Sequence, residues 1–277
     1  MKISLPAQFQ NVTFEGDKGL FLVRESCIDG LKQVIEENNP FEVTGRTARG
    51  SVTGFQTLSG EAFVIRRYVH GGLLGTVLNE IHWGLGRALE ELAVSEKAIE
   101  KGLKTPQIVA IRCQNILGPF WRLDLVTRKL ENVRPLEELL REDVESATQR
   151  SLIDKVAEIV RSMHEVGLWH ADLHIRNLLV QEGVSPKDEQ VYIVDLDRSR
   201  MHSSLTPGKA AQNLYRLNRS IEKFTGDGSG LTTADRMRFL KAYLGHGQPV
   251  RTRQWMKECA RHLRRHRFWW KLTGKSL

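Results

Sequence analysis

The sequence predicts an α+β protein of two lobes: a small β-rich N-terminal lobe and a larger helical C-terminal lobe. Short apolar stretches bounded by turn residues are typical of strands; they occur at residues 41–44, 51–57, 62–65, 108–112 and 121–127. From residue 135 onward the apolar positions recur at helical spacing instead, most clearly over 148–166. Such a change of periodicity part-way along one chain is typical of α+β proteins.

These patterns divide the chain into three parts. An Asn-Pro pair interrupts the chain at the end of residues 1–40, which we expect to be an N-terminal extension packed on the first lobe. Residues 41–130 then form the N lobe and residues 131–277 the C lobe, with a hinge near 127–131. A chain of 277 residues is long enough to bury a core in each lobe.

Composition excludes several classes of protein. Apolar residues make up 40% and charged residues 27%, as in ordinary globular proteins. Neither a membrane-spanning run nor a signal peptide is recognisable. The three cysteines, Cys27, Cys113 and Cys259, lie far apart and do not suggest a disulfide framework or a metal cluster. We therefore expect a cytoplasmic protein. Its net charge of +8 implies an acidic partner: nucleic acid, anionic lipid or a phosphorylated glycan.

The most specific chemical pattern lies within residues 168–197. His170, Asp172 and Asn177 form the motif His-x-Asp-Leu-x-x-x-x-Asn, and Asp195 ends an apolar run downstream. Phosphoryl transfer from ATP needs one carboxylate to orient the acceptor hydroxyl, and an amide with a second carboxylate to hold Mg²⁺. In order and approximate spacing these residues match the catalytic loop and metal-binding motif of protein kinases. The alternative is a chance pair of buried, hydrogen-bonded aspartates.

This match assigns a role to each residue. Asp172 is the catalytic carboxylate, and Asn177 and Asp195 are the metal ligands. His170 is expected to support the loop through hydrogen bonds rather than to take part in the chemistry.

The N lobe offers backbone contacts for ATP. Gly45, Gly50 and Ser51 lie in a turn ahead of an apolar strand, where glycine lets N–H groups approach phosphate oxygens. The turn lacks the middle glycine of the usual protein-kinase loop, so an ordinary hairpin turn is the alternative. Backbone groups from Thr127 to Leu130, at the hinge, are expected to contact adenine.

Arg66 directly follows the apolar strand predicted at residues 62–65. Protein kinases carry at this position the lysine that contacts the phosphates of ATP. Arginine stays charged and offers a planar fork for phosphate or carboxylate. The alternative is a surface arginine on an edge strand, a description that we expect to fit Arg67 instead.

A helix is predicted over residues 76–101, ending at Gly102. In a kinase one glutamate of this helix pairs with the cation of the strand. Glu91 is the expected partner, and Glu90 and Glu96 are the alternatives.

The chain also resembles a narrower family. Residues 163–180 and 194–198 resemble the lipopolysaccharide kinases, which phosphorylate Kdo or heptose sugars of the inner core, and the Kdo kinases in particular. Further stretches similar to that family are residues 64–73, 121–127 and 213–223. The family pattern is similar in having arginine at the position of Arg66. The resemblance implies ATP and Mg²⁺ as cofactors, a lipopolysaccharide precursor as substrate, and work at the cytoplasmic face of the inner membrane.

The segment after Asp195 bears on the acceptor. It lacks the Phe-Gly and Ala-Pro-Glu motifs of protein kinases, and a helix resumes near residue 208, which leaves little room for a peptide-docking segment. We therefore expect a sugar acceptor. A protein serine or threonine, a small metabolite, or a pseudokinase without catalysis are the alternatives. Asp197 is either a second acid near the metal or the structural partner of Arg198.

The last 17 residues, 261–277, are basic and aromatic and include Phe268, Trp269 and Trp270. Such a tail suits peripheral binding to an anionic membrane surface. The alternative is that the tryptophans pack back onto the C lobe and the cations are solvated. No nucleic-acid partner is expected.

Overall fold

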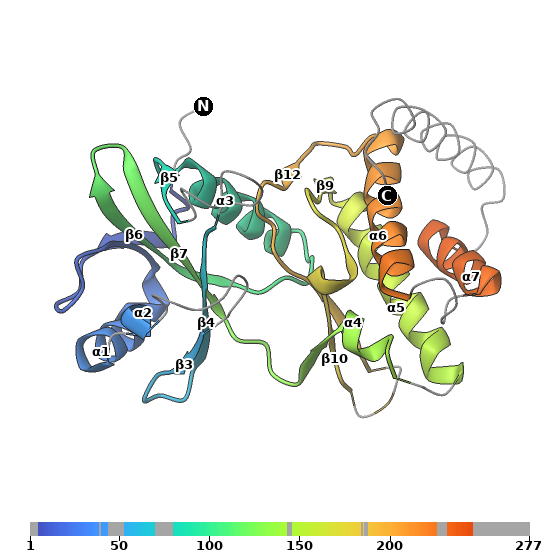
Figure 1. The fold of residues 1–277 in the computed structure, drawn as a ribbon, viewed down its shortest axis with the longest axis horizontal. Helices are drawn as coiled ribbons and strands as arrows, with labels where there is room; N and C mark the ends of the chain where they lie inside the picture. Colours follow the sequence, from blue (N-terminus) through green and yellow to red (C-terminus); the bar gives the residue numbers. More distant parts are fainter. Residues whose placement is uncertain are drawn as a thin grey trace. The chain divides into compact units, whose positions relative to one another are not determined.

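A computed structural model of the chain describes residues 5–38, 40–43, 53–69, 80–142, 146–183, 185, 188–225 and 232–245. The chain forms two compact units (Figure 1). The first unit contains Met1–Ile99 and Pro106–Leu130, and the second contains Glu100–Thr105 and Glu131–Leu277. Residues 100–105 therefore group with the second unit, although the expected division had them in the N lobe. The glycine turn with Gly45, Gly50 and Ser51 and the tail at 261–277 lie outside the described residues.

The first unit is built on a seven-stranded antiparallel sheet. Its strands are β1 (Phe9–Val12), β2 (Leu20–Arg24), β3 (Thr53–Gln56), β4 (Ala62–Arg67), β5 (His82–Trp83), β6 (Ile108–Leu117) and β7 (Phe120–Arg128). The order is β1-β2-β6-β7-β4-β3, and β5 pairs with β7. The N-terminal segment does more than pack on the sheet, because it supplies β1 and β2.

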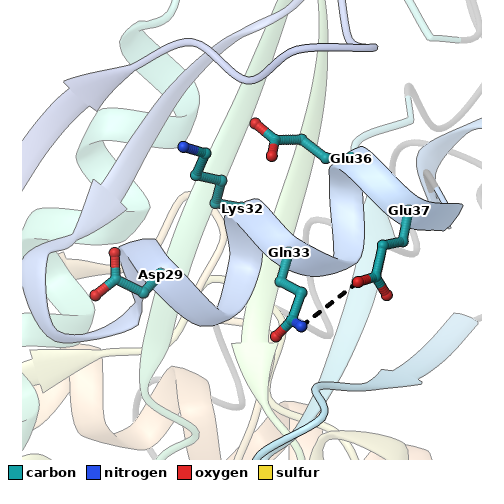
Figure 2. A pocket seen from close by; sticks show the side chains of 5 residues that line it. All are labelled: Asp29, Lys32, Gln33, Glu36 and Glu37. Atoms are coloured by element: carbon teal, nitrogen blue, oxygen red, sulfur yellow. Dashed lines mark hydrogen bonds between the residues drawn. The ribbon is translucent and has the colours of Figure 1, made fainter.

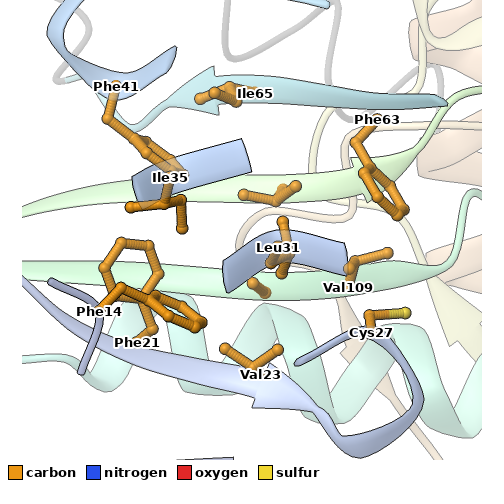
Figure 3. Packing of buried hydrophobic residues seen from close by; sticks show 12 residues of the cluster. Phe14, Phe21, Val23, Cys27, Leu31, Ile35, Phe41, Phe63, Ile65 and Val109 are labelled. Carbon is orange, nitrogen blue, oxygen red and sulfur yellow. The ribbon is translucent and has the colours of Figure 1, made fainter. Parts of the chain in front are cut away.

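Helix α1 (Ile28–Asn38) follows the 3-10 helix η1 (Glu25–Cys27) and covers one face of the sheet. Its outer side is charged and lines a pocket formed by Asp29, Lys32, Gln33, Glu36 and Glu37 (Figure 2). Its inner side packs Leu31 and Ile35 against Phe21, Val23 and Val109 of the strands (Figure 3). This amphipathic arrangement buries the sheet beneath α1.

The opposite face of the sheet packs against helix α3 (Gly86–Glu100). Ala88 and Leu92 of α3 are almost fully buried with Ile108, Ile111 and Leu123 of the sheet. A second set of buried apolar residues therefore closes this face as well.

Two expectations for the first unit are wrong. Residues 40–43 form a short helix, α2 (Pro40–Val43), not a strand; proline is well suited to a first helical turn, since its φ is fixed there and no N–H is needed. The helix expected over 76–101 begins only at Gly86, because β5 comes first, its Trp83 pairing with Phe120. Gly84, at φ +66°, then turns the chain. Residues 70–79 lie outside the described part.

The second unit is mainly helical. Its helices are α4 (Leu136–Leu139), α5 (Ser146–Glu165), α6 (Pro207–Thr225) and α7 (Thr233–Leu244). Short strands connect them: β8 (Val133–Pro135), β9 (Leu168–Trp169), β10 (Leu178–Gln181), β11 (Gln190–Ile193) and β12 (Arg200–Met201). They pair as β11-β10-β8 and β12-β9. The apolar residues of α5 are buried at the helical spacing that the sequence shows.

Across the described ranges, no helix has both the length and the apolar character that crossing a bilayer requires.

Gly167 marks a close approach of two backbones in the second unit. It has φ +87°, and its carbonyl accepts a hydrogen bond of 2.8 Å from the N–H of His202. A Cβ atom here would lie 2.1 Å from the His202 carbonyl oxygen. We expect Gly167→Ala to lower the free energy of unfolding by about 2–4 kcal/mol, since it adds a steric clash to a left-handed backbone. Denaturant unfolding measures this loss.

Gly102→Ala is the matched control for this substitution. Gly102 has a similar φ of +80°, but a Cβ atom there meets nothing within 4 Å. We expect it to cost only the conformational part, about 1 kcal/mol. Equal losses in the two variants would show that the contact with His202 is unimportant.

Candidate active site

The loop between β9 and β10 is organised around a buried imidazole. His170 is fully buried, and its Nδ1 accepts a hydrogen bond of 3.1 Å from the backbone N–H of Asp172. Nδ1 therefore carries no proton, so Nε2–H donates to the carbonyl oxygen of Val194, 3.2 Å away. Val194 directly precedes Asp195. One neutral side chain thus links the two segments that contain the predicted catalytic residues.

Burial keeps this imidazole neutral. It lowers the pKa of His170, and this effect outweighs the hydrogen bond to Val194 and the charges of Asp195 and Asp172, which favour the protonated form. A neutral ring is required, because a protonated Nδ1 cannot accept from the N–H of Asp172. His170 therefore has the supporting position that the motif suggests.

Asn213 of α6 holds the same loop from the other side. Its Nδ2 donates to the carbonyl oxygen of His170 at 2.6 Å, and its Oδ1 accepts from the N–H of His170 at 3.2 Å. Arg216 donates to the carbonyl oxygen of Ala171, and the Ser220 hydroxyl accepts from the loop at Ile175. The sequence motifs did not predict these roles for α6.

A signal for these contacts was present in the sequence. Asn213, Arg216 and Ser220 recur at helical spacing and so share one face of α6. Polar side chains in a stripe on an otherwise packed helix indicate contacts to backbone groups.

A polar chain continues from Asn213 to α7. His164 of α5 lies 3.3 Å from Asn213 Oδ1 through Nε2, and its Nδ1 lies 2.7 Å from the hydroxyl of Tyr243. Because Oδ1 is an acceptor, Nε2–H donates to it and Nδ1 accepts from Tyr243. Burial lowers the pKa of His164 to about 4. The loop is thus connected to three helices by groups that stay neutral near pH 7.

The side chains of Asp172 and Asn177 differ in exposure. The carboxylate of Asp172 is 77% exposed, whereas Asn177 is buried and donates through Nδ2 to the carbonyl oxygen of Asp172 at 2.9 Å. That bond fixes the amide orientation and leaves Oδ1 as its acceptor atom. His174 Nε2 lies 3.6 Å from Asp172 Oδ2. A reacting group can therefore reach Asp172 from solvent, while its backbone is held.

Asp195 follows β11 in a left-handed conformation, with φ +62°. Few residue types tolerate this region, although aspartate is among those enriched there. Its side chain is exposed. Asp197 is mostly buried, with Oδ2 at 3.8 Å from Arg198 Nε, which agrees with its structural alternative.

The donor set suits a magnesium ion. The Asn177 amide oxygen and the Asp195 carboxylate are hard oxygen ligands of the kind that Mg²⁺ takes. A magnesium site usually has only one or two protein carboxylates, and substrate phosphates and waters supply the other ligands. Such a site needs no larger cluster, and within the described residues no three His, Cys, Asp or Glu side chains gather as metal ligands.

In the first unit the structure brings Arg66 and Glu91 together. Arg66 Nη2 lies 2.7 and 2.9 Å from the two carboxylate oxygens of Glu91. Tyr68 donates its hydroxyl to Glu91 at 2.5 Å, and the Arg66 guanidinium lies over its ring. Of the alternatives, Glu96 pairs with Arg24, and Glu90 is exposed.

The expectation that Arg67 is a surface residue on an edge strand is wrong. Strand β4 lies between β7 and β3, and the side chain of Arg67 is only 11% exposed. Its Nε donates to Asp124 at 2.8 Å, and the fully buried Asp124 also pairs with Arg112 at 3.1 Å. Strand alternation sends Arg66 and Arg67 to opposite faces, and both faces are covered.

The hinge stretch is partly used by the sheet. Thr127 lies in β7, opposite Val64 of β4 and Ile108 of β6. The N–H of Arg128 donates to the carbonyl oxygen of Gln107, and the N–H of Lys129 donates to that of Ala62. Of the residues expected to contact adenine, Thr127 to Lys129 are therefore hydrogen-bonded or paired with the sheet, and Leu130 comes directly after them.

The chain is similar to known proteins over most of its length. Residues 38–243 match the model described as the lipopolysaccharide kinase (Kdo/WaaP) family. The chain is 30% identical over 181 residues to the 3-deoxy-D-manno-octulosonic acid kinase of Vibrio cholerae, which covers 64% of this chain and 72% of that protein. A protein of the same name from Actinobacillus succinogenes is 29% identical over 207 residues, covering 71% and 83%.

The fold is likewise similar to a solved structure. The structure described as WaaP in complex with acyl carrier protein superposes with a TM-score of 0.58 at 22% identity. The match covers 85% of this chain and 94% of that one. At this identity the likeness concerns the fold.

The buried state of His164 predicts a loss of stability in acid. Its pKa is about 4 when folded, against 6.5 ordinarily. Between these values the unfolded chain binds more protons, so the contribution is full above about pH 6.5 and falls as the pH drops toward 4. We expect this loss to be on the order of 3 kcal/mol by pH 4. Urea unfolding from pH 7 to pH 4.5 measures it.

His164→Gln is the control, since glutamine keeps polar atoms but does not titrate in this range. The variant should be less stable than the native protein at pH 7 and should lose less stability on acidification. Parallel pH profiles for the two proteins would mean that His164 does not titrate as its burial implies.

Proposed function

Because this chain belongs to the lipopolysaccharide kinase (Kdo/WaaP) family, we propose that it transfers the γ-phosphoryl group of ATP to a hydroxyl of Kdo in the lipopolysaccharide inner core. The observation that carries the proposal is the loop from His170 to Asn177, with one exposed carboxylate on a rigidly held backbone. Curated relatives named for 3-deoxy-D-manno-octulosonic acid favour Kdo over heptose.

In this proposal Asp172 orients the acceptor hydroxyl and takes its proton as the oxygen attacks. An exposed carboxylate can reach a hydroxyl, and the hydrogen bonds of its backbone to His170 and Asn177 keep it in position. Positioning of this kind supplies much of the rate in phosphoryl transfer, because the transition state makes few covalent demands on the protein.

Asn177 and Asp195 would hold Mg²⁺ on the phosphates. The bound ion would neutralise charge that develops on the transferred phosphoryl group. In the first unit, Arg66 would contact phosphate oxygens with the orientation that Glu91 and Tyr68 give it. We assign Gly45, Gly50 and Ser51 to the phosphates, and Thr127 and Leu130 to adenine.

A sugar suits this site better than a protein acceptor. The connection from Asp195 to α6 is short and is fastened to the loop: Arg200 pairs with Trp169, and the N–H of Ala171 donates to the Ser199 hydroxyl. A peptide-docking segment has no place there. The alternatives are a metabolite acceptor and a pseudokinase, and transfer to the Kdo-containing precursor would argue against both. We further propose work at the cytoplasmic face of the inner membrane.

The direct test is phosphoryl transfer with the purified chain. With Mg²⁺ and ATP it should phosphorylate a lipid A precursor that carries Kdo, and mass spectrometry should place the added phosphate on Kdo. A precursor without Kdo should not react. Phosphate on heptose would move the acceptor within the family, whereas ATP binding without transfer would favour the pseudokinase.

Asp172→Ala is the catalytic control in the same assay. We expect kcat to fall about a hundredfold or more, with ATP binding largely intact, because only the acceptor side loses its carboxylate. Turnover near the native rate would remove Asp172 from the mechanism.

Arg66 and Arg67 form a natural pair for separating binding from folding. Arg66→Ala should raise the KM for ATP several-fold and should cost less stability than Arg67→Ala, since the Arg66 side chain is 29% exposed and Tyr68 still donates to Glu91. Arg67→Ala should instead lower the free energy of unfolding by about 3 kcal/mol, because it removes a partner of the buried Asp124. Thermal unfolding and ATP titration measure the two effects. A stability loss confined to Arg66→Ala would reverse the assignment.

A further inference from the structure

Exposed apolar side chains gather at one end of the first unit. Within the described ranges six large hydrophobic residues are exposed, and four of them lie together: Trp83, Ile116, Leu117 and Phe120. We call these four the hairpin patch. They belong to β5 and to the hairpin formed by β6 and β7 (Figure 1). Such clustering indicates an interaction surface, unlike apolar residues that are exposed singly.

Three of the four patch residues are cross-strand neighbours. Leu117 pairs with Phe120 across the hairpin, and Trp83 pairs with Phe120 across β5 and β7. The rings of Trp83 and Phe120 meet edge to face, 5.5 Å between centroids. Trp83 and Leu117 nevertheless remain 77% and 74% exposed, so the patch faces outward rather than forming a core.

The hairpin tip carries no charge. From residue 113 to residue 121 the sequence contains no Asp, Glu, Lys or Arg. The charged residues on either side are in ion pairs: Arg112 contacts Asp17 and Asp124, and Arg122 contacts Glu80. Because the tip is uncharged and the arginines beside it are in ion pairs, the tip can move from water into an apolar medium without burying an unpaired charge.

Two backbone carbonyl groups at the tip accept hydrogen bonds from within the protein. The side-chain Nδ2 of Asn115 donates to the carbonyl oxygen of Gly118 at 2.8 Å, and the N–H of Gly84 donates to that of Pro119 at 2.9 Å. Pro119 itself has no N–H. Internal satisfaction of these groups is what a turn needs in order to enter the apolar part of a bilayer, where no water is available to them.

We propose that the hairpin patch inserts into the interfacial layer of a lipid bilayer. Tryptophan and phenylalanine suit that layer, and Ile116 and Leu117 supply aliphatic area. Lipid is favoured as the occupant because the tip is uncharged and the carbonyl groups of Gly118 and Pro119 in its turn are already hydrogen-bonded. The net charge of +8 adds attraction to anionic headgroups. The identification of that bilayer as the inner membrane rests on the proposed function.

The test uses the full chain and phosphatidylcholine vesicles, without ATP or acceptor. In about 0.5 M salt, charge interactions are screened, so binding reports apolar insertion. Leu117→Glu should weaken vesicle partitioning about tenfold or more in flotation assays, and Trp83→Gln should weaken it as well. Leu58→Glu is the matched control: Leu58 is 73% exposed in the same unit but lies apart from the patch, on the β3–β4 turn. It should bind like the native protein.

Native-like binding of Leu117→Glu and Trp83→Gln, or no vesicle binding by the native chain, would overturn the proposal. So would a dimer in sedimentation that Leu117→Glu dissociates with no effect on vesicles, since the patch would then join two copies. Equal thermal stability of the variants shows that they are folded. The two proposals can fail separately. If the chain transfers no phosphate to the sugar but its vesicle binding still depends on Leu117, the proposed function is rejected and the membrane role of the hairpin patch stands.

Discussion

The hydrogen bonds of one neutral imidazole link the two segments of the second unit that contain the predicted catalytic residues. His170 accepts from Asp172 and donates to Val194, so it connects the predicted catalytic loop to the strand end that carries Asp195. Both contacts require the same neutral tautomer, and burial disfavours the protonated ring. Asn213 then orients the His170 backbone with an uncharged amide. The negative charge near the loop is therefore left to the carboxylates that are proposed to meet substrate and metal.

Much of the fold was predictable because its signals are local. The kinase-like α+β fold class and the lipopolysaccharide kinase family are confirmed by the comparisons. The helix with buried residues from Leu152 to Met163 follows from periodicity alone. Pairing of distant segments has no comparable signal. In the sheet, β2 pairs with β6 and β1 with β2, while β5 pairs with β7. These pairings are made by backbone hydrogen bonds, so the pattern of side chains does not indicate which strands are neighbours.

The candidate site was predictable to a different extent in its two parts. The pairing of Arg66 with Glu91 was expected from the kinase pattern and the spacing typical of the family, and the structure contains that ion pair. The role of Arg67 was missed, because a charged residue at a strand end gives no sign of the buried Asp124 opposite it. Asn213 was missed although it belongs to a polar stripe on α6, because the stripe does not indicate which backbone atoms, far away in sequence, it contacts. The assignments of metal, adenine and acceptor contacts stay predictions.

The packing of α1 and α3 on opposite faces of one sheet limits how the first unit can meet a ligand. Phe21 and Val23 lie under α1, and Ile111 and Leu123 lie against α3, so the middle of the sheet is closed to small molecules from both sides. Only strand ends, turns and the outer strands remain for recognition. Variation among related sequences at the covered positions should therefore track side-chain volume, whereas variation at the strand ends should track the chemistry of whatever is bound.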